Sequence, residues 1–172
     1  MAVTETASAH EHGSPPLLPE CLTEHTSCVI AKIGQAAARL IDAELEALGL
    51  RTRHYQVLKA LAAGTTTSQQ ALGSALRIDG ATMVSTIDDL EAARLVRRQR
   101  NDKDRRSYTV ALTRAGRATL AQADRLLERL DEALLADVPG EEQEPLQRSL
   151  RRLVRDGGLA RTVDEARARS AR

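Results

Sequence analysis

The stretch from Leu95 to Leu112, LVRRQRNDKDRRSYTVAL, holds two short segments of β-type pattern on either side of a charged tip. The first segment runs from Leu95 to Arg100, and the second, Tyr108 to Leu112, alternates apolar and small residues with period two. This pair predicts a β-hairpin with its tip in solvent. Because the hairpin directly follows a helix-turn-helix pattern, the order is typical of a winged DNA-binding module.

The predicted hairpin tip, Asp102–Ser107, carries two adjacent arginines, Arg105 and Arg106. Guanidinium groups suit the narrow minor groove of DNA, where the negative potential is strong. Asp104 is poorly placed beside a phosphate, so we expect it to pair with a neighbouring arginine and fix the direction of its planar fork. The alternative is a solvated, charge-balanced turn.

Positive charge is concentrated around the predicted wing. From Arg94 to Arg117, nine basic residues stand against Asp102 and Asp104, a net charge of +7, although the whole chain carries only +1. Residues 1–76 hold five basic and seven acidic residues. Because the local field attracts a polyanion, the near-neutral total does not argue against binding to nucleic acid.

Two short helices separated by a tight turn precede the hairpin. Ser68 is a plausible N-cap for a helix that reaches Leu76, and Asp79 could cap a second helix from Gly80 to about Ala93. The expected apolar stripe of the second helix is Met83, Val84, Ile87 and Leu90. In a helix-turn-helix the second helix lies in the major groove. The alternative is a helical hairpin within a bundle.

The exposed side of the second helix offers small residues and hydroxyl groups near its start. The residues small enough for close approach to DNA are Gly80, Ala81, Thr82, Ser85 and Thr86. Among them, Thr82 and Ser85 carry hydroxyls that can reach bases or phosphates. The start of this helix is therefore the candidate for direct readout of base edges.

Longer amphipathic helices are predicted on both sides of this module. One runs from about Leu22 to a stop at Gly49, and a second from about Arg53 to Ala63. After the hairpin, Thr113 caps a long helix that reaches about Val138, and a last helix spans about Glu141 to Arg155. The long helix has a narrow apolar seam, which packs against this chain or a partner subunit: Leu120, Ala123, Leu127, Leu130 and Leu134.

The predicted fold is therefore mainly α with a small β-hairpin, a winged helix-turn-helix domain plus N- and C-terminal dimerisation helices. We expect a disordered tail at 1–20, a single domain at 21–158, and a basic tail or short helix at 159–172. Within the domain, 21–50 and 115–158 are the dimerisation helices and 52–113 the DNA-binding lobe. The chain has no Trp or Phe, so Leu, Ile, Val and Ala must build the core.

Other classes of protein find little support in the sequence. No apolar run approaches the roughly 18 residues that a membrane span needs, so we expect a soluble, cytoplasmic protein. No nucleophile and base, and no paired acids, mark an enzyme, and no cofactor or metal site is predicted. A helical adaptor that binds proteins would explain the amphipathic helices but would leave the +7 wing without a purpose.

The order of elements resembles that of the multiple-antibiotic-resistance regulator family, MarR. The stretch that carries the resemblance is Asn101–Leu120, NDKDRRSYTVALTRAGRATL, with its Asp-x-Arg-Arg tip, the Leu-Thr that ends the strand, and Gly116 in the next helix. Gly49-Leu50 and Leu90-Glu91 match as well, and the resemblance covers roughly residues 24–155. It implies a homodimer whose first and last helices interlock and whose winged modules read an inverted-repeat operator in double-stranded DNA.

The resemblance also implies roles for single residues. Arg106 resembles the wing arginine that enters the minor groove, with Asp104 as its orienting partner, and Ser68 falls where the preceding helix contacts phosphate. Thr82, Val84 and Ser85 fall at recognition-helix positions near bases. The full set of predicted DNA contacts is Ser68, Gln69, Ala81, Thr82, Val84, Ser85, Arg97, Arg100, Lys103, Asp104, Arg105 and Arg106.

Members of this family usually act as repressors that a small ligand or oxidation releases from DNA. The resemblance implies an effector pocket between the dimerising helices and the winged module, for which the candidate polar residues are Arg39, Arg53, His54 and Tyr55. An arginine there would suit a phenolate or carboxylate, although His54 could equally be a surface histidine. We therefore expect a small-molecule effector, an aromatic acid or another anion.

Cys28 offers an alternative, thiol-based redox sensor. It lies near where the organic-hydroperoxide branch of the family keeps its reactive cysteine, but the match is one residue out of register and the expected tyrosines are missing. We favour an inert thiol. A zinc-sensing version is disfavoured, because His25 and His54 are the only histidines in segments expected to be ordered and no His-x-x-x-His pair is present.

Overall fold

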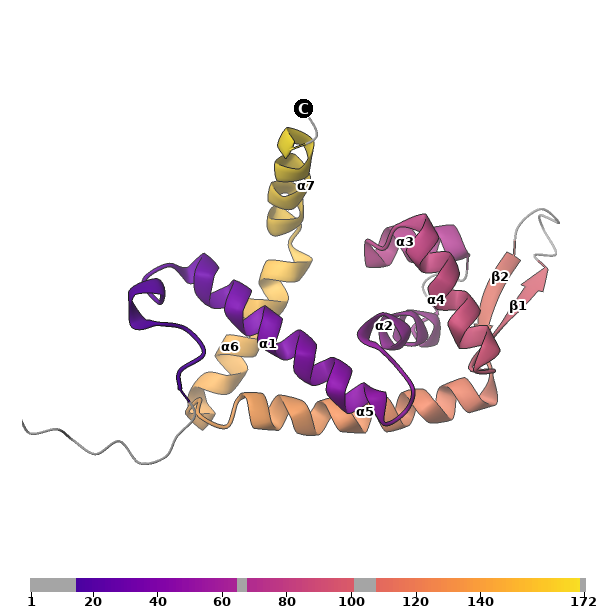
Figure 1. Ribbon diagram of the computed structural model, residues 1–172, viewed down its shortest axis with the longest axis horizontal. Coiled ribbons are helices and arrows are strands. Elements are labelled where there is room, and N and C mark those ends of the chain that lie inside the picture. Colours follow the sequence, from indigo (N-terminus) through magenta and orange to yellow (C-terminus); the bar gives the residue numbers. More distant parts are fainter. Residues whose placement is uncertain (1–14, 65–67, 101–107, 171–172) are drawn as a thin grey trace, which may run out of the picture. The chain divides into compact units, whose positions relative to one another are not determined.

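The computed structural model describes residues 15–64, 68–100 and 108–170. Its described part is mainly helical, with one two-stranded antiparallel sheet, as the sequence predicted (Figure 1). The chain forms two compact units, Met1–Thr52 and Arg53–Arg172. The predicted hairpin tip and most of the predicted N-terminal tail lie outside the described residues. None of the helices in the described ranges has the length and apolar character that a membrane-spanning segment needs.

The first unit contains a short 3-10 helix, η1 (Glu20–Leu22), and one long helix, α1 (Thr26–Glu46). The helix α1 begins four residues later than predicted, because η1 and a turn precede it. After α1 the chain reverses at Gly49, whose φ of 67° favours glycine. Thr52 fixes this reversal, because its backbone N–H and its hydroxyl both donate to Asp42 Oδ1 at 2.8 Å.

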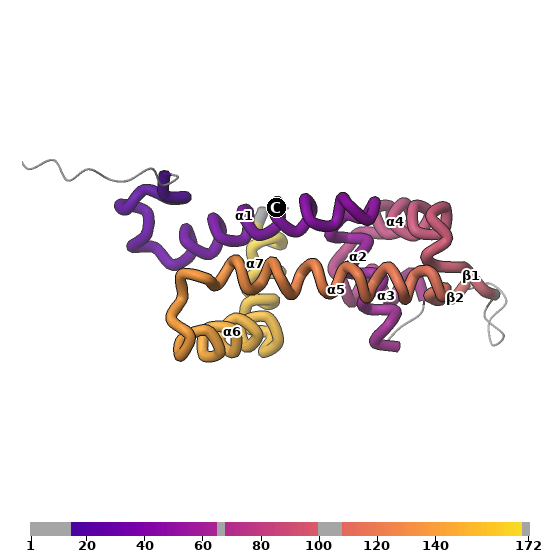
Figure 2. Tube along the Cα trace, turned by 90° about the horizontal axis from the view of Figure 1, so that it is seen from below, coloured from indigo at the N-terminus to yellow at the C-terminus, as the bar shows by residue number. Residues whose placement is uncertain are grey.

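The remaining elements are α2 (Thr52–Ala62), α3 (Gln69–Leu76), α4 (Gly80–Ala92), β1 (Val96–Arg100), β2 (Tyr108–Leu112), α5 (Arg114–Leu134), α6 (Gly140–Arg155) and α7 (Gly158–Ser170). The α3–α4 pair is the predicted helix-turn-helix, and β1 and β2 pair antiparallel in the predicted hairpin, with Val96 opposite Leu112. Figure 2 shows α5 as a long rod that leads from the hairpin toward α6.

The three predicted N-caps are confirmed by their hydrogen bonds. The side-chain oxygens of Ser68, Asp79 and Thr113 accept from backbone N–H groups three residues further on, at 3.1, 2.9 and 2.9 Å. The predicted end of α5 at Val138 was wrong. The helix ends at Leu134, and tight turns follow before Pro139, which disfavours the helical conformation in the residue before it.

Aliphatic side chains from α2, α3, α4, both strands and the first half of α5 form the core of the second unit. Its fully buried members include Val57, Leu58, Leu72, Met83, Ile87, Leu90, Val96 and Val110. Two predictions for α4 were wrong: Val84 is 42% exposed rather than part of the apolar stripe, and Thr86 is buried rather than available to DNA. Thr86 tolerates burial because its hydroxyl donates to Thr82 O at 2.7 Å.

The end of α4, the wing and the start of α5 meet at the backbone of Leu95. Leu95 O accepts from Thr113 N at 3.0 Å and from Thr113 Oγ1 at 3.1 Å. Gly116 lies against the same carbonyl, so closely that a Cβ atom there would stand 2.0 Å from the oxygen. Arg94, with a φ of 58°, turns the chain from α4 into this junction. The glycine noted in the sequence is therefore required by close packing of backbones.

Ion pairs join the wing to α4. The guanidinium of Arg98, on β1, donates to Glu91 and Asp88 of α4, and the backbone N–H of Arg98 donates to Glu91 Oε1 at 2.9 Å. These hydrogen bonds, first from the backbone N–H and then from the side chain, lower the pKa of Glu91. The three residues, which we call the wing brace, fix the hairpin relative to the helix that precedes it.

We predict that Gly116→Ala destabilises the protein by about 1–3 kcal/mol, because the added methyl group must displace the Leu95 backbone. Urea denaturation measures the free energy of unfolding. Gly140→Ala is the matched control, since no atom lies within 4 Å of a Cβ there, and it should change stability by less than about 0.5 kcal/mol. Equal effects of the two substitutions would contradict the junction.

The wing brace also predicts a pH dependence. Because the pKa of Glu91 is lowered from its ordinary 4.5, its stabilisation is present above pH 4.5 and is lost as the pH falls through the lowered pKa. Glu91→Gln should therefore be less stable than the wild type at pH 7, and this difference should shrink toward pH 3. Denaturation at both pH values checks this, with Glu132→Gln on α5 as control. A difference that is the same at both pH values would refute the prediction.

Candidate nucleic-acid interface

The exposed face of α4 carries the predicted base-contacting residues. Ala81, Val84 and Ser85 are exposed, and their spacing of three and four places them on one face of the helix, on the side away from buried Met83 and Ile87. Asp79 caps the helix, and the hydrogen bonds from Thr82, first from its backbone N–H, lower the pKa of the Asp79 carboxyl. These three side chains are small and uncharged, which suits close approach to base edges in the major groove, and Asp88, one turn further along the same face, is paired with Arg98.

The predicted contacts on α3 lie beside the wing. Ser68, at the start of α3, forms an isolated antiparallel bridge with Thr109 of β2, so the helix start is held next to the hairpin. The Ser68 hydroxyl oxygen accepts from Ala71 N, which leaves its hydrogen free to donate to a phosphate. Gln69 is half-buried at the first helical position. These residues are therefore joined structurally to both α4 and the wing.

The described arginines of the wing differ in their availability. Arg97 is exposed on β1, whereas the charge of Arg98 is opposed by Asp88 and Glu91. The electrostatic field around residues 94–117 is therefore weaker than their net charge of +7 indicates. Arg100 ends β1. The predicted residues Lys103, Asp104, Arg105 and Arg106 lie outside the described residues, and their roles stay predictions.

The predicted effector residues of α2 turn toward two different carboxylates. Arg53 Nη2 and His54 Nε2 approach Asp89 Oδ2, on α4, at 3.5 and 3.3 Å. Tyr55 instead donates to Asp124 Oδ1 of α5 at 2.9 Å, where Lys59 Nζ also binds at 2.7 Å. Arg53 Nε is buried without a hydrogen-bond partner among the described residues. Arg39 lies exposed on α1, in the other unit.

Burial, and then the hydrogen bond with Asp124, raise the pKa of Tyr55 well above its usual value. The phenol therefore stays protonated and donates its hydrogen to the carboxylate throughout the physiological range. This contact joins the start of α2, next to Arg53, to the middle of the long helix α5. The sequence left open whether His54 lies at the surface. In the structure its side chain is buried.

The two cysteines are free, and both lie in the first unit. Cys28 is half-buried in the first turn of α1, and Cys21 is exposed in η1. Within the described part of the chain, no group of three or more His, Cys, Asp or Glu side chains is arranged to hold a metal ion.

Two sets of contacts at this surface were not predicted from the sequence. The wing brace has a sequence signal, since Asp88 and Glu91 are carboxylates three residues apart on the helix that precedes the wing. The second contact joins Arg77, at the end of α3, to Asp164 of α7 through two hydrogen bonds of 2.8 and 3.0 Å. A contact between residues 87 positions apart leaves no local pattern, so nothing in the sequence pointed to it.

Comparison with known proteins agrees with this architecture. The family model for the MarR family matches residues 48–107. Transcriptional regulator HosA of Escherichia coli O111:H- is 33% identical over 100 residues, which cover 58% of this chain and 74% of HosA. A putative transcriptional regulatory protein for the hcr operon of Thauera aromatica is 31% identical over 101 residues, 59% of this chain and 61% of that protein.

Among solved structures, a mutant MarR from E. coli complexed with operator DNA has a similar fold, with a TM-score of 0.65 and 23% identity. The match covers 74% of this chain and 91% of that one. The family model spans the helix-turn-helix and the start of the wing, and HosA is matched over about three quarters of its length. This chain therefore belongs to the MarR family of transcriptional regulators.

Proposed function

We propose that the protein is a homodimeric repressor that binds an inverted-repeat operator in double-stranded DNA and is released by a small anionic effector. The observation that carries the DNA-binding part is the exposed face of α4 with its small, uncharged side chains, held between the start of α3 and the hairpin. In a helix-turn-helix such a face enters the major groove, while the neighbouring elements contact phosphates.

Exposed apolar side chains on the helices outside the DNA-binding lobe support a dimer. In α6 none of the residues is buried, yet Leu146, Leu150 and Leu153 form an apolar stripe that is 37–51% exposed. In α1, Ile30, Ile33 and Leu40 are 43–56% exposed. Apolar faces of this kind are stabilised by burial against another surface, and a second copy of the chain provides a symmetric one.

In a dimer, the two recognition helices must lie at a set distance from each other to bind DNA together. Two recognition helices enter successive major grooves of one DNA face only if they lie about one helical turn, roughly 34 Å, apart. A mutant of E. coli MarR, whose fold is similar, binds operator DNA in its crystal structure. An effector that binds more tightly to a dimer with a different separation of the recognition helices would shift the population toward that conformation and release DNA.

We predict that the purified protein is a dimer and selects an inverted-repeat duplex from a randomised pool. Its affinity should fall steeply as salt rises, because the contacts with phosphates release counterions. Sedimentation equilibrium measures the dimer, and fluorescence anisotropy measures affinity for the selected duplex and for a scrambled one. A monomer, or equal affinity for both duplexes, would refute the proposal.

Arg106→Ala tests the wing in the same assay. It should greatly weaken binding to the selected duplex while it leaves the dimer and the thermal unfolding unchanged, since the residue is predicted at a solvated tip. Arg129→Ala, which removes the same charge from α5, is the control and should bind like the wild type. Unchanged affinity of Arg106→Ala would refute the assignment of the wing.

For the effector, we propose that an anion binds Arg53 and competes with Asp89. The distance of 3.5 Å between Arg53 Nη2 and Asp89 Oδ2 is long for a charged pair, and Arg53 Nε has no partner among the described residues, so a better-placed acceptor would be favoured. Asp89 belongs to α4. Withdrawal of Arg53 from Asp89 would therefore change a contact of the recognition helix itself.

We predict that aromatic carboxylates raise the melting temperature through mass action and weaken operator binding. Benzoate and its neutral analogue benzamide form a matched pair, and only benzoate should shift the melting temperature. Arg53→Gln should abolish the shift, whereas Arg125→Gln on α5 should retain it. A panel of aromatic and aliphatic carboxylates without any shift, or an equal shift in Arg53→Gln, would contradict an anion site at Arg53.

A further inference from the structure

The helix α7 lies beyond residues 48–107, which match the MarR family model, yet it contacts the DNA-binding lobe. Arg77, in the turn between α3 and α4, donates two hydrogen bonds to the Asp164 carboxylate of α7, at 2.8 and 3.0 Å. This pair raises the pKa of Arg77 and lowers that of Asp164, so both stay charged at neutral pH. The bidentate geometry fixes the direction of the Arg77 guanidinium as well as its position.

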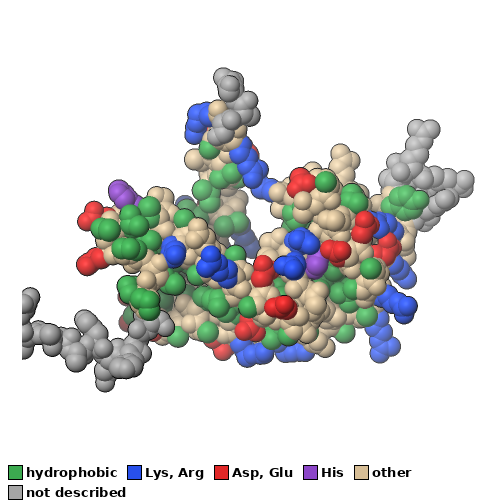
Figure 3. Space-filling model, viewed as in Figure 1, with side chains coloured by type: hydrophobic (Ala, Val, Ile, Leu, Met, Phe, Trp, Pro, Cys, Tyr) green, Lys and Arg blue, Asp and Glu red, His purple; other side chains and the backbone are tan. Residues whose placement is uncertain are grey.

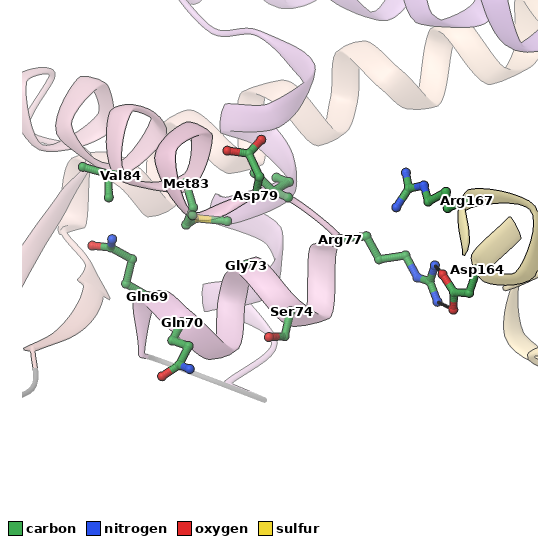
Figure 4. A pocket seen from close by; sticks show the side chains of 12 residues that line it. Gln69, Gln70, Gly73, Ser74, Arg77, Asp79, Met83, Val84, Asp164 and Arg167 are labelled. Carbon is green, nitrogen blue, oxygen red and sulfur yellow. Dashed lines mark hydrogen bonds and ion pairs between the residues drawn. The ribbon is translucent and has the colours of Figure 1, made fainter. Parts of the chain in front are cut away.

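The backbone of Arg77 adopts a left-handed conformation at the point where its side chain leaves the turn. Arg77 ends α3 with a φ of 54°, a conformation in which glycine would be less strained, and Ile78 N donates to Gly73 O at 2.9 Å across the turn. The chain thus carries an arginine at a position where helix ends favour glycine. The long side chain reaches from the turn to α7, as Figure 4 shows.

Between α7 and the helix-turn-helix lies an open hollow of about 910 Å³. Its lining includes Gln69 and Val84, two of the predicted DNA contacts, together with the exposed donors Gln70 and Ser74 of α3. Arg167 of α7 lines the same hollow, and Figure 4 shows its side chain pointing toward the lobe. The hollow is therefore continuous with the proposed DNA-reading face.

Among the described residues that line the hollow, the charged side chains are paired to different extents. The Asp164 carboxylate is held by Arg77, and Asp79 accepts the N–H of Thr82 at the start of α4, where the helix dipole opposes its charge. Arg167 has no ion-pair partner within 4.0 Å among the residues that the structure describes, and it is exposed. Figure 3 shows further basic side chains, in blue, along α7, where all of the basic residues are arginines.

We propose that α7 is a further DNA-contacting element, in addition to α3, α4 and the wing, in which Arg167 binds a phosphate of the operator strand that passes α3 and the start of α4. Amide, hydroxyl and guanidinium donors together are the groups that bind DNA phosphates, whereas the hollow has no aromatic side chain to stack on a flat ligand. Arg77 and Asp164 act as positioning residues that hold α7 beside the lobe. This inference rests on the proposed function.

The test compares the salt dependence of binding in single variants of the full-length protein. For the duplex that the wild type selects, Arg167→Ala should make the slope of log K against log salt less negative by about 0.9 for each lost phosphate contact, or about 1.8 in a dimer. Arg167→Lys should retain most of the slope, because lysine also binds phosphate. Since Arg167 is exposed, thermal unfolding should be unchanged in both variants.

Arg169→Ala is the matched control. It removes the same charge from the same helix, but residue 169 lies roughly 200° around the helix from residue 167 and does not line the hollow. Its slope should equal that of the wild type. An unchanged slope in Arg167→Ala, an equal loss in Arg169→Ala, or tighter binding without the Arg167 charge would overturn the role of α7. Failure of the wild type to select any duplex would instead overturn the proposed function.

Discussion

The carbonyl group of Leu95 is the point on which the DNA-reading lobe depends. It accepts two hydrogen bonds from Thr113, and Gly116 packs against it without room for a side chain. The recognition helix α4 ends and the first strand of the wing begins within a few residues of Leu95, and the residue that caps the long helix α5 is hydrogen-bonded to its carbonyl. A change in the direction of α5 at this junction therefore reaches both the recognition helix and the wing.

The electrostatics of the lobe depend on which charges are already paired. The sequence concentrates arginines near the wing, but Arg98 is used to hold the hairpin on α4, and Arg77 is used to hold α7. Paired arginines position elements, whereas exposed ones such as Arg97 and Arg167 stay available to a polyanion. A count of charges along the chain thus overstates the electrostatic field that DNA would meet.

Local patterns in the sequence predicted much of the fold. Caps at Ser68, Asp79 and Thr113 depend on residues three positions apart, and the hairpin depends on alternation within a single strand, so both could be found without a structure. The end of α5 and the exposure of Val84 could not be found in this way. They depend on the turns that follow a helix and on which neighbouring helices cover each side chain. The contact of Arg77 with Asp164 was beyond prediction, since it joins distant parts of the chain. At the candidate interface, the exposure of Ala81 and Ser85 followed from spacing, whereas the shared carboxylate of Arg53 and His54 required the structure.

The scarcity of aromatic residues has a practical consequence. Tyr55 and Tyr108 are the only aromatic side chains in the chain, and no tryptophan masks their emission. Tyr108 is exposed at the end of the hairpin strands, opposite Arg100, while Tyr55 is hydrogen-bonded to Asp124 beside the candidate effector residues. Each therefore acts as an intrinsic spectroscopic probe of a different part of the molecule, and single Tyr→Phe variants would separate the optical signal of the wing from that of the contact between α2 and α5 without any added label.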